Sequence, residues 1–121
     1  MKNALIKIDN LVFNKQFDEA LEGIEYLINY VNNLNDKKYD LQLAHLYYYK
    51  ASILNLLNKF DEALEASNRS CKLDSTNVKH FCLRKSIHEC LGNKEAAMHD
   101  QIRVFEKCLQ LFKAEKKSLK M

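Results

Sequence analysis

One short segment occurs twice in this chain of 121 residues, and it constrains the fold more than any other feature. Residues 14–22 read NKQFDEALE, and residues 58–65 read NKFDEALE. A weaker third copy, GNKEAAM, occupies residues 92–98. Phe17 and Phe60 are 43 residues apart, and Phe60 and its counterpart Lys94 are 34 residues apart. Similarity at such a spacing indicates a repeat architecture, in which each copy is one supersecondary unit.

The residues that make tight turns are nearly missing. The chain has no proline and only two glycines, Gly23 and Gly92. Sandwiches and barrels need many tight turns, which depend on these two residue types. Apolar residues make up 47% and charged residues 29%, as in an ordinary globular protein. We therefore expect one all-α domain rather than a β-sheet protein or a disordered chain.

Each copy of the segment lies between two amphipathic helical patterns, so the unit is a helix, a tight turn and a second helix. Asn14, Asn58 and Gly92 tolerate the left-handed conformation that ends a helix. Acidic residues follow each turn, where they favour the positive end of the next helix dipole. Six helices are predicted, at about 2–14, 17–34, 40–57, 60–73, 77–91 and 94–116.

A helix–turn–helix unit of about 34 residues with these landmarks resembles the tetratricopeptide repeat (TPR) family. Residues 44–77 match best, with Ala51 and Ala63 at the small positions and Phe60 at the aromatic position of the turn. Leu73 and Asp74 match the closing pair, and Ser75 stands where the family usually has proline. The resemblance implies a right-handed superhelical stack of three antiparallel helix hairpins.

The resemblance covers nearly the whole chain as a single TPR-like domain, residues 1–121. Two repeats lack the family's small residue in their first helix, because Ile8 and Lys85 occupy that position. About nine extra residues, around 32–40, separate the first repeat from the second. The expected repeats are 1–34, 44–77 and 78–112, followed by a basic helix end at 113–121.

The net charge of +3 is concentrated at one end of the sequence. Residues 107–121 contain five lysines and one acid, Glu115, whereas the rest of the chain is nearly neutral. A nucleic-acid-binding domain usually carries its charge over one face. In the nucleic-acid alternative, the lysines of 113–120 together with Lys79, Arg84 and Lys85 would contact the nucleic acid. We expect nucleic acid not to be the partner.

Membrane insertion and disulfide bonding are not expected either. The longest run without a charged residue, 26–35, has half the length that a membrane span needs. The four cysteines form no C-x-x-C pair, and a small secreted domain would more often pair its cysteines at tight spacings. These features predict reduced thiols in a cytoplasmic, intracellular and reducing compartment.

No enzyme signature is present. Two glycines so far apart cannot form a phosphate-binding loop. His88 and Glu89 are followed by Cys90 and Leu91, which is not the H-E-x-x-H zinc motif. His80, Cys82 and Cys90 do not share one helix face at ligand distance. We therefore expect no catalysis, no metal ion and no cofactor.

The resemblance implies that the first helix of each hairpin lines a concave groove. The family's groove positions correspond to Leu5, Asp9, Phe13, His45, Tyr48, Ser52, Asn55, Leu56, Lys79, Cys82, Ser86 and Glu89, with Val12 and Cys90 beside them. Chaperone-docking members hold an acidic peptide tail with five residues, and the matching positions here are Leu5, Asp9, Tyr49, Lys79 and Leu83. Only Lys79 fits, so an acidic-tail clamp is not expected.

The function predicted from these observations is a non-enzymatic protein–protein interaction module that binds a peptide or a helical segment in its groove. Tyr48 is its central candidate contact, because a partly exposed tyrosine combines a rigid ring with a hydroxyl group. The alternative is a small structural subunit embedded in a larger multiprotein assembly. The small size of the chain and the lack of a recognisable ligand clamp favour that alternative.

Overall fold

The computed structural model describes residues 2–119, which are helical apart from short connections. Met1, Lys120 and Met121, which belong to the predicted first repeat and basic end, lie outside the described residues. The predicted helix bounds agree with the observed ones to within three residues, and the sequence did not predict η1. The elements are α1 Lys2–Phe13, α2 Phe17–Leu34, η1 Lys37–Tyr39, α3 Asp40–Leu56, α4 Phe60–Leu73, α5 Val78–Cys90 and α6 Lys94–Leu119.

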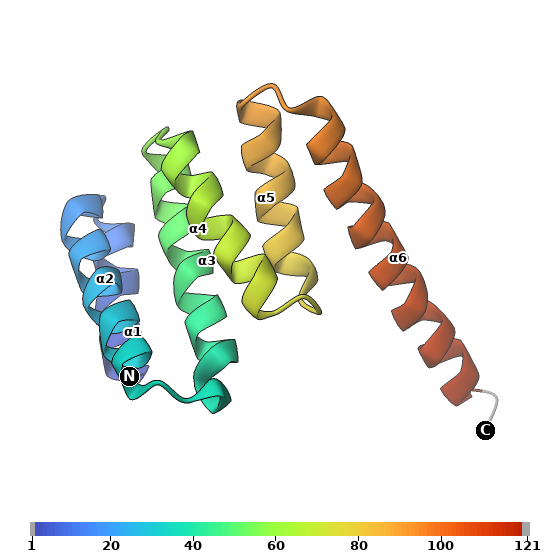
Figure 1. Cartoon of the computed structure of the whole chain (residues 1–121), viewed down its shortest axis with the longest axis horizontal. Helices are drawn as coiled ribbons and strands as arrows, with labels where there is room; N and C mark the ends of the chain where they lie inside the picture. Colours follow the sequence, from blue (N-terminus) through green and yellow to red (C-terminus); the bar gives the residue numbers. More distant parts are fainter. Residues whose placement is uncertain (1, 120–121) are drawn as a thin grey trace.

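The helices form three hairpins in chain order. α1 packs on α2, α3 on α4, and α5 on α6, and contacts of α2 with α3 and of α4 with α5 join the hairpins. In Figure 1, α1 lies behind α2 and α3 behind α4, so the first helices of these hairpins share one layer. α3 also contacts α5. The all-α stack of three antiparallel hairpins is confirmed.

The three hairpin turns share one backbone conformation, in which one residue has a positive φ angle. Lys15, Asn58 and Gly92 have φ angles of 61°, 61° and 78°, and each lies two residues before the helix that follows. The prediction was correct for Asn58 and Gly92 but wrong for Asn14. The extra residue Gln16 shifts the first turn by one position, so Lys15 adopts the left-handed conformation instead. Lysine has no special tolerance for this conformation, so it gave no sequence signal.

Two clusters of buried side chains hold the hairpins together. The first joins α1, α2 and α3 and includes Ile8, Ile24 and Leu46. The second joins α3, α4 and α5 and is made of Ala51, Leu54, Ala63, Ala66 and Ile87. Ala51, Ala63 and Ala66 are small, and their side chains let the helices approach closely. Ala63 is completely buried at this contact. The layer of α1, α3 and α5 is therefore fixed by its packing against α2 and α4.

An ion pair joins the two helices of the third hairpin, and one further hydrogen bond of its arginine reaches the second hairpin. On α5, Arg84 donates from Nε to Oδ2 of Asp100 at 2.9 Å and from Nη2 to Oδ1 at 2.7 Å. Its Nη1 donates to Oδ1 of Asn68 on α4 at 3.2 Å. Asp100, on α6, is only 4% exposed. The hydrogen bonding to Asp100 raises the pKa of Arg84, although its burial opposes the change. One guanidinium therefore links α4, α5 and α6.

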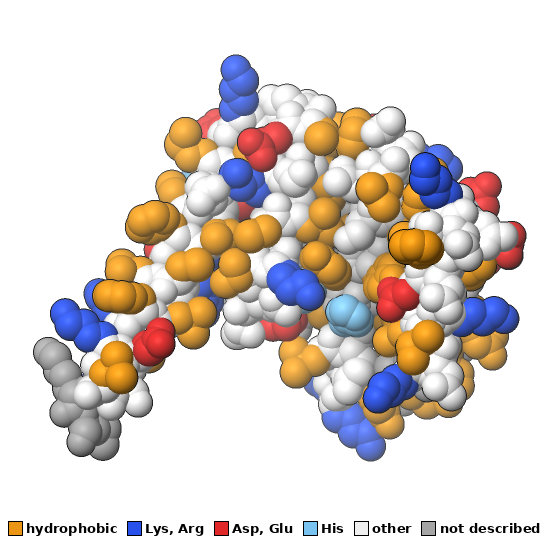
Figure 2. Space-filling model, turned by 180° about the vertical axis from the view of Figure 1, so that it is seen from behind, with side chains coloured by type: hydrophobic (Ala, Val, Ile, Leu, Met, Phe, Trp, Pro, Cys, Tyr) orange, Lys and Arg blue, Asp and Glu red, His pale blue; other side chains and the backbone are white. Residues whose placement is uncertain are grey.

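The second half of α6 extends away from the other helices. Its buried residues, Ala97 and Asp100, lie in its first two turns. Every described residue after Lys107 is exposed. Figure 1 shows α6 continuing well past the end of α5, and Figure 2 shows hydrophobic side chains along it. This half of the helix has no packing partner among residues 2–119.

Candidate functional site

All twelve predicted groove residues lie on the first helices of the hairpins. α1 carries Leu5, Asp9 and Phe13, α3 carries five of the residues, and α5 carries Lys79, Cys82, Ser86 and Glu89. Figure 2 views this layer from behind Figure 1 and shows hydrophobic side chains interspersed with Lys, Arg, acidic and His side chains. The face is mixed in character, as the sequence predicted. Whether these residues bind a ligand remains a prediction.

The side chains converge most closely around Tyr48 of α3, which is half-buried. The His45 ring stacks on its ring with a centroid distance of 6.3 Å. From α5, the His80 ring lies 5.2 Å away, and Nζ of Lys79 lies 5.4 Å from the ring centroid. Two helices thus build one aromatic surface with a cation at its edge.

A small apolar pocket adjoins this aromatic surface on the α1 side. It has a volume of 270 Å³ and is lined by Leu5, Leu41, Gln42, His45 and Leu46. Leu41 is 63% exposed and was missed by the sequence analysis. It lies one helical turn before His45, so the i, i+4 spacing of α3 was the available signal. Leu5, His45 and Tyr48 therefore belong to one continuous surface.

Several predicted groove residues lie apart from this surface or are engaged locally. Phe13 is 87% and Leu56 61% exposed, and each ends its helix beside a hairpin turn. The Ser52 hydroxyl donates to the Tyr48 carbonyl oxygen at 2.9 Å. Glu89 forms an ion pair with Lys85 at 3.5 Å. Among the described residues, the buried Oδ1 of Asn55 has no hydrogen-bond partner. The surface around Tyr48 is thus the better-defined part of the predicted set.

His80 was considered in the sequence only as a metal ligand, but it is a buried residue beneath Tyr48. It is 2% exposed, and its Nε2 lies 3.8 Å from Oδ2 of Asp74. Burial lowers the pKa of His80, Asp74 opposes this effect, and His45 and Lys79 reinforce it. Desolvation and Lys79 also lower the pKa of His45, against the effect of Asp9. Both rings are therefore mainly neutral at pH 7.

Because the pKa values of His45 and His80 are lowered in the folded state, we expect the protein to lose stability in acid. Because the folded-state pKa values lie below the unfolded value of 6.5, the unfolded chain binds protons more readily. The free energy of unfolding should therefore decrease as the pH falls below 6.5, until the folded-state values are passed. We expect a lower melting temperature at about pH 5.5 than at about pH 7.5, and a smaller difference in His80→Gln. His99→Gln, at an exposed position, is the control; equal pH dependence in both variants would contradict the assignment.

Four further observations on the described residues concern metal binding, thiol reactivity, membrane insertion and nucleic-acid binding. In residues 2–119, no group of three or more His, Cys, Asp or Glu side chains is arranged to hold a metal ion. Burial raises the pKa of Cys71 to about 11, so this thiol is not an activated nucleophile. None of the described helices is long and apolar enough to cross a membrane. Arg84, one of the residues in the nucleic-acid alternative, is already bound to Asp100.

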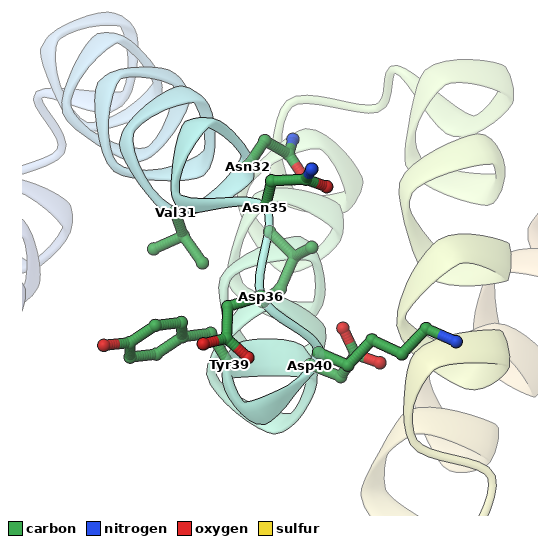
Figure 3. Close-up of a pocket in the computed structure, with 8 residues that line it drawn as sticks. Val31, Asn32, Asn35, Asp36, Tyr39 and Asp40 are labelled. Atoms are coloured by element: carbon green, nitrogen blue, oxygen red, sulfur yellow. The ribbon is translucent and has the colours of Figure 1, made fainter.

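A second hollow lies at the connection between α2 and α3. It has a volume of 220 Å³, and Figure 3 shows Asn32 and Asn35 close together at the end of α2. The extra residues of this connection form their own turn: Asn35 has φ 47°, and Oδ1 of Asp36 accepts from the Lys38 amide at 3.0 Å. Asp36 therefore caps η1, and its environment has a local structural explanation.

Comparison with known proteins supports the architecture. No protein-family model and no curated protein matches the sequence. A solved structure described as the first TPR of Spaghetti (RPAP3) bound to HSP90 peptide SRMEEVD superposes with a TM-score of 0.67. The match covers 99% of this chain and 95% of the other, with 20% sequence identity. The chain has the TPR fold. Its three hairpins thus form the right-handed superhelical stack that the sequence resemblance implied.

The same neighbour corrects one expectation about ligands. The sequence analysis did not expect an acidic-tail clamp, because only Lys79 matched the five clamp positions. A TPR domain that shares the fold at 20% identity is bound to SRMEEVD, a peptide with three acidic residues. That finding contradicts the expectation. Positions matched one by one over such distant sequences are too weak a basis for excluding this class of peptide from a TPR domain.

Proposed function

We propose that this TPR domain is a non-enzymatic protein–protein interaction module, an adaptor or scaffold of the cytoplasm. In this proposal it binds a peptide or helical segment in the groove formed by α1, α3 and α5. The observation that carries the proposal is the convergence of His45, Tyr48 and Lys79 beside the pocket of Leu5 and Leu41. Surfaces built by several rigid helices position contact residues better than a loop does.

The chemistry of this surface suits a peptide that has both an apolar side chain and a carboxylate. The Tyr48 ring offers contact area and its hydroxyl a hydrogen bond. Lys79 is exposed and supplies a cation for a carboxylate. The pocket lined by Leu5, Leu41 and Leu46 accepts a small apolar side chain. SRMEEVD combines these features, since it contains Met and Val next to acidic residues, and it is therefore the first probe.

Replacing Tyr48 with alanine should weaken peptide binding by about 1–3 kcal/mol, because it removes the central aromatic contact. The measurement is fluorescence anisotropy of labelled SRMEEVD titrated with the chain. Tyr30→Ala is the matched control, because Tyr30 is 57% exposed on α2, outside the groove layer. Circular dichroism should show the same helicity in both variants.

Two results would contradict the proposal that a peptide binds in the groove. A silent Tyr48→Ala together with a large, salt-dependent loss in Lys116→Gln/Lys117→Gln would assign binding to the basic helix end. Absence of binding to SRMEEVD and to a peptide library would favour the structural subunit instead. The exposed apolar residues of α6 give that alternative its physical basis, since a permanent partner would cover them.

A further inference from the structure

An exposed apolar stripe runs along most of α6. We call Met98, Ile102, Phe105, Leu109 and Phe112 the α6 stripe. They follow one another at spacings of four and three residues, which places them on one side of the helix. Each is between 45% and 68% exposed. Large apolar side chains aligned in this way mark an interaction surface.

A complementary surface lies at the other end of the stack. An open groove of 400 Å³ runs between α1 and α2, and we call it the α1–α2 groove. Its apolar lining includes Ala4, Ile8, Leu11 and Leu27, and Tyr26, 71% exposed, also lines it. Gly23 belongs to the lining as well, and a Cβ atom there would lie 3.2 Å from Cγ1 of Ile8. The lining residues of each helix lie about one turn apart, so the groove follows the helices.

The charges beside the two surfaces are opposite in sign. Lys113, Lys116 and Lys117, with one acid, Glu115, follow the end of the α6 stripe. The α1–α2 groove is lined by two glutamates, Glu19 and Glu22, and one lysine, Lys7. Opposite charges beside matching apolar surfaces fix the register of an association and increase its rate.

We propose that a second copy of this chain occupies the groove. In this arrangement the α6 stripe of one copy packs into the α1–α2 groove of the next, with the lysines of α6 beside Glu19 and Glu22. An amphipathic helix in an apolar groove is a recurring mode of recognition. The contact is heterologous, so each copy retains one free stripe and one free groove, and association can continue.

The proposed contact is separate from the peptide-binding surface. Leu5 of α1 lines the pocket beside Tyr48, whereas Ala4, Ile8 and Leu11 line the α1–α2 groove. Pairing of two α6 stripes would leave the α1–α2 groove uncovered, and a parallel pair would place the same lysines together. Head-to-tail association covers the α6 stripe and the α1–α2 groove together, and it brings the lysines of α6 close to the glutamates of the groove.

Two variants separate the two sides of the contact. The stripe variant is Phe105→Glu/Leu109→Glu, and the groove variant is Glu22→Lys/Tyr26→Lys; all four positions are exposed, so the fold should be retained. Sedimentation velocity of the parent chain should show a mass that rises with concentration and falls with added salt. Each variant alone should associate about 10- to 100-fold more weakly. Leu111→Glu is the matched control, because Leu111 is 66% exposed but lies off the stripe, and it should associate like the parent.

Mixing the variants gives the decisive measurement. The stripe variant retains an intact groove and the groove variant an intact stripe, so the mixture should form a heterodimer that does not grow further. A parent that is monomeric at all concentrations would overturn the proposal. A groove variant that still dimerises, with no complementation in the mixture, would show pairing of two α6 stripes and would also overturn it. Circular dichroism verifies that each variant is helical.

Discussion

Asp100→Ala is expected to lower the free energy of unfolding by about 2–4 kcal/mol. Asp100 is 4% exposed and accepts two hydrogen bonds from Arg84. Removing it leaves the guanidinium without its carboxylate in a partly buried position, which is the costly way to break an ion pair. The Arg84 side chain is 23% exposed, so water recovers part of the loss. Urea titration followed by circular dichroism measures the effect.

The exposed ion pair between Lys85 and Glu89 provides the control. It lies on the same helix as Arg84, and its side chains are 33% and 56% exposed. Pairs of this kind contribute about 0.3–0.5 kcal/mol, so Lys85→Ala should be nearly silent. Arg84→Met/Asp100→Leu should recover much of the stability, because it leaves no unpaired charge. Equal losses in Asp100→Ala and Lys85→Ala would show that the buried pair does not hold α5 and α6 together.

The sequence predicted the fold well because its determinants are local or repeated. The duplicated segment located two turns, and the lack of proline left the helical patterns uninterrupted. η1 was missed because its capping residue, Asp36, lies in a short polar connection without periodicity. The prediction ended α6 near residue 116, whereas the helix continues to Leu119. The lysines there are good helix formers and give no stop signal.

The candidate site was less predictable because its features depend on contacts between helices. The resemblance implied that α1, α3 and α5 line a groove, and Tyr48 does lie among residues from α3 and α5. Nothing in the sequence distinguished the buried His80 from an exposed histidine. The pair Arg84 and Asp100 is 16 residues apart, on two helices, so no spacing rule could find it. The clamp comparison failed because it treated aligned positions as equivalent side-chain geometry.

Ala63→Leu is expected to lower the free energy of unfolding by about 1–3 kcal/mol or more. Ala63 is completely buried in the cluster with Ala51, Leu54 and Ile87, where α3, α4 and α5 meet. A larger side chain there must push these helices apart or adopt a strained rotamer. An array of three repeats has little additional interface with which to absorb the strain. Thermal unfolding followed by circular dichroism gives the change.

Two further variants separate overpacking from a general effect of leucine. Ala114→Leu lies on the exposed end of α6, and it should change the stability by less than about 0.5 kcal/mol. Leu54→Ala creates space in the same cluster as Ala63, so Ala63→Leu/Leu54→Ala should be more stable than the sum of the two single effects predicts. Additive losses would mean that the two sites do not share a packing volume. An Ala63→Leu chain that melts like its parent would show that α3 and α4 do not cross closely at this position.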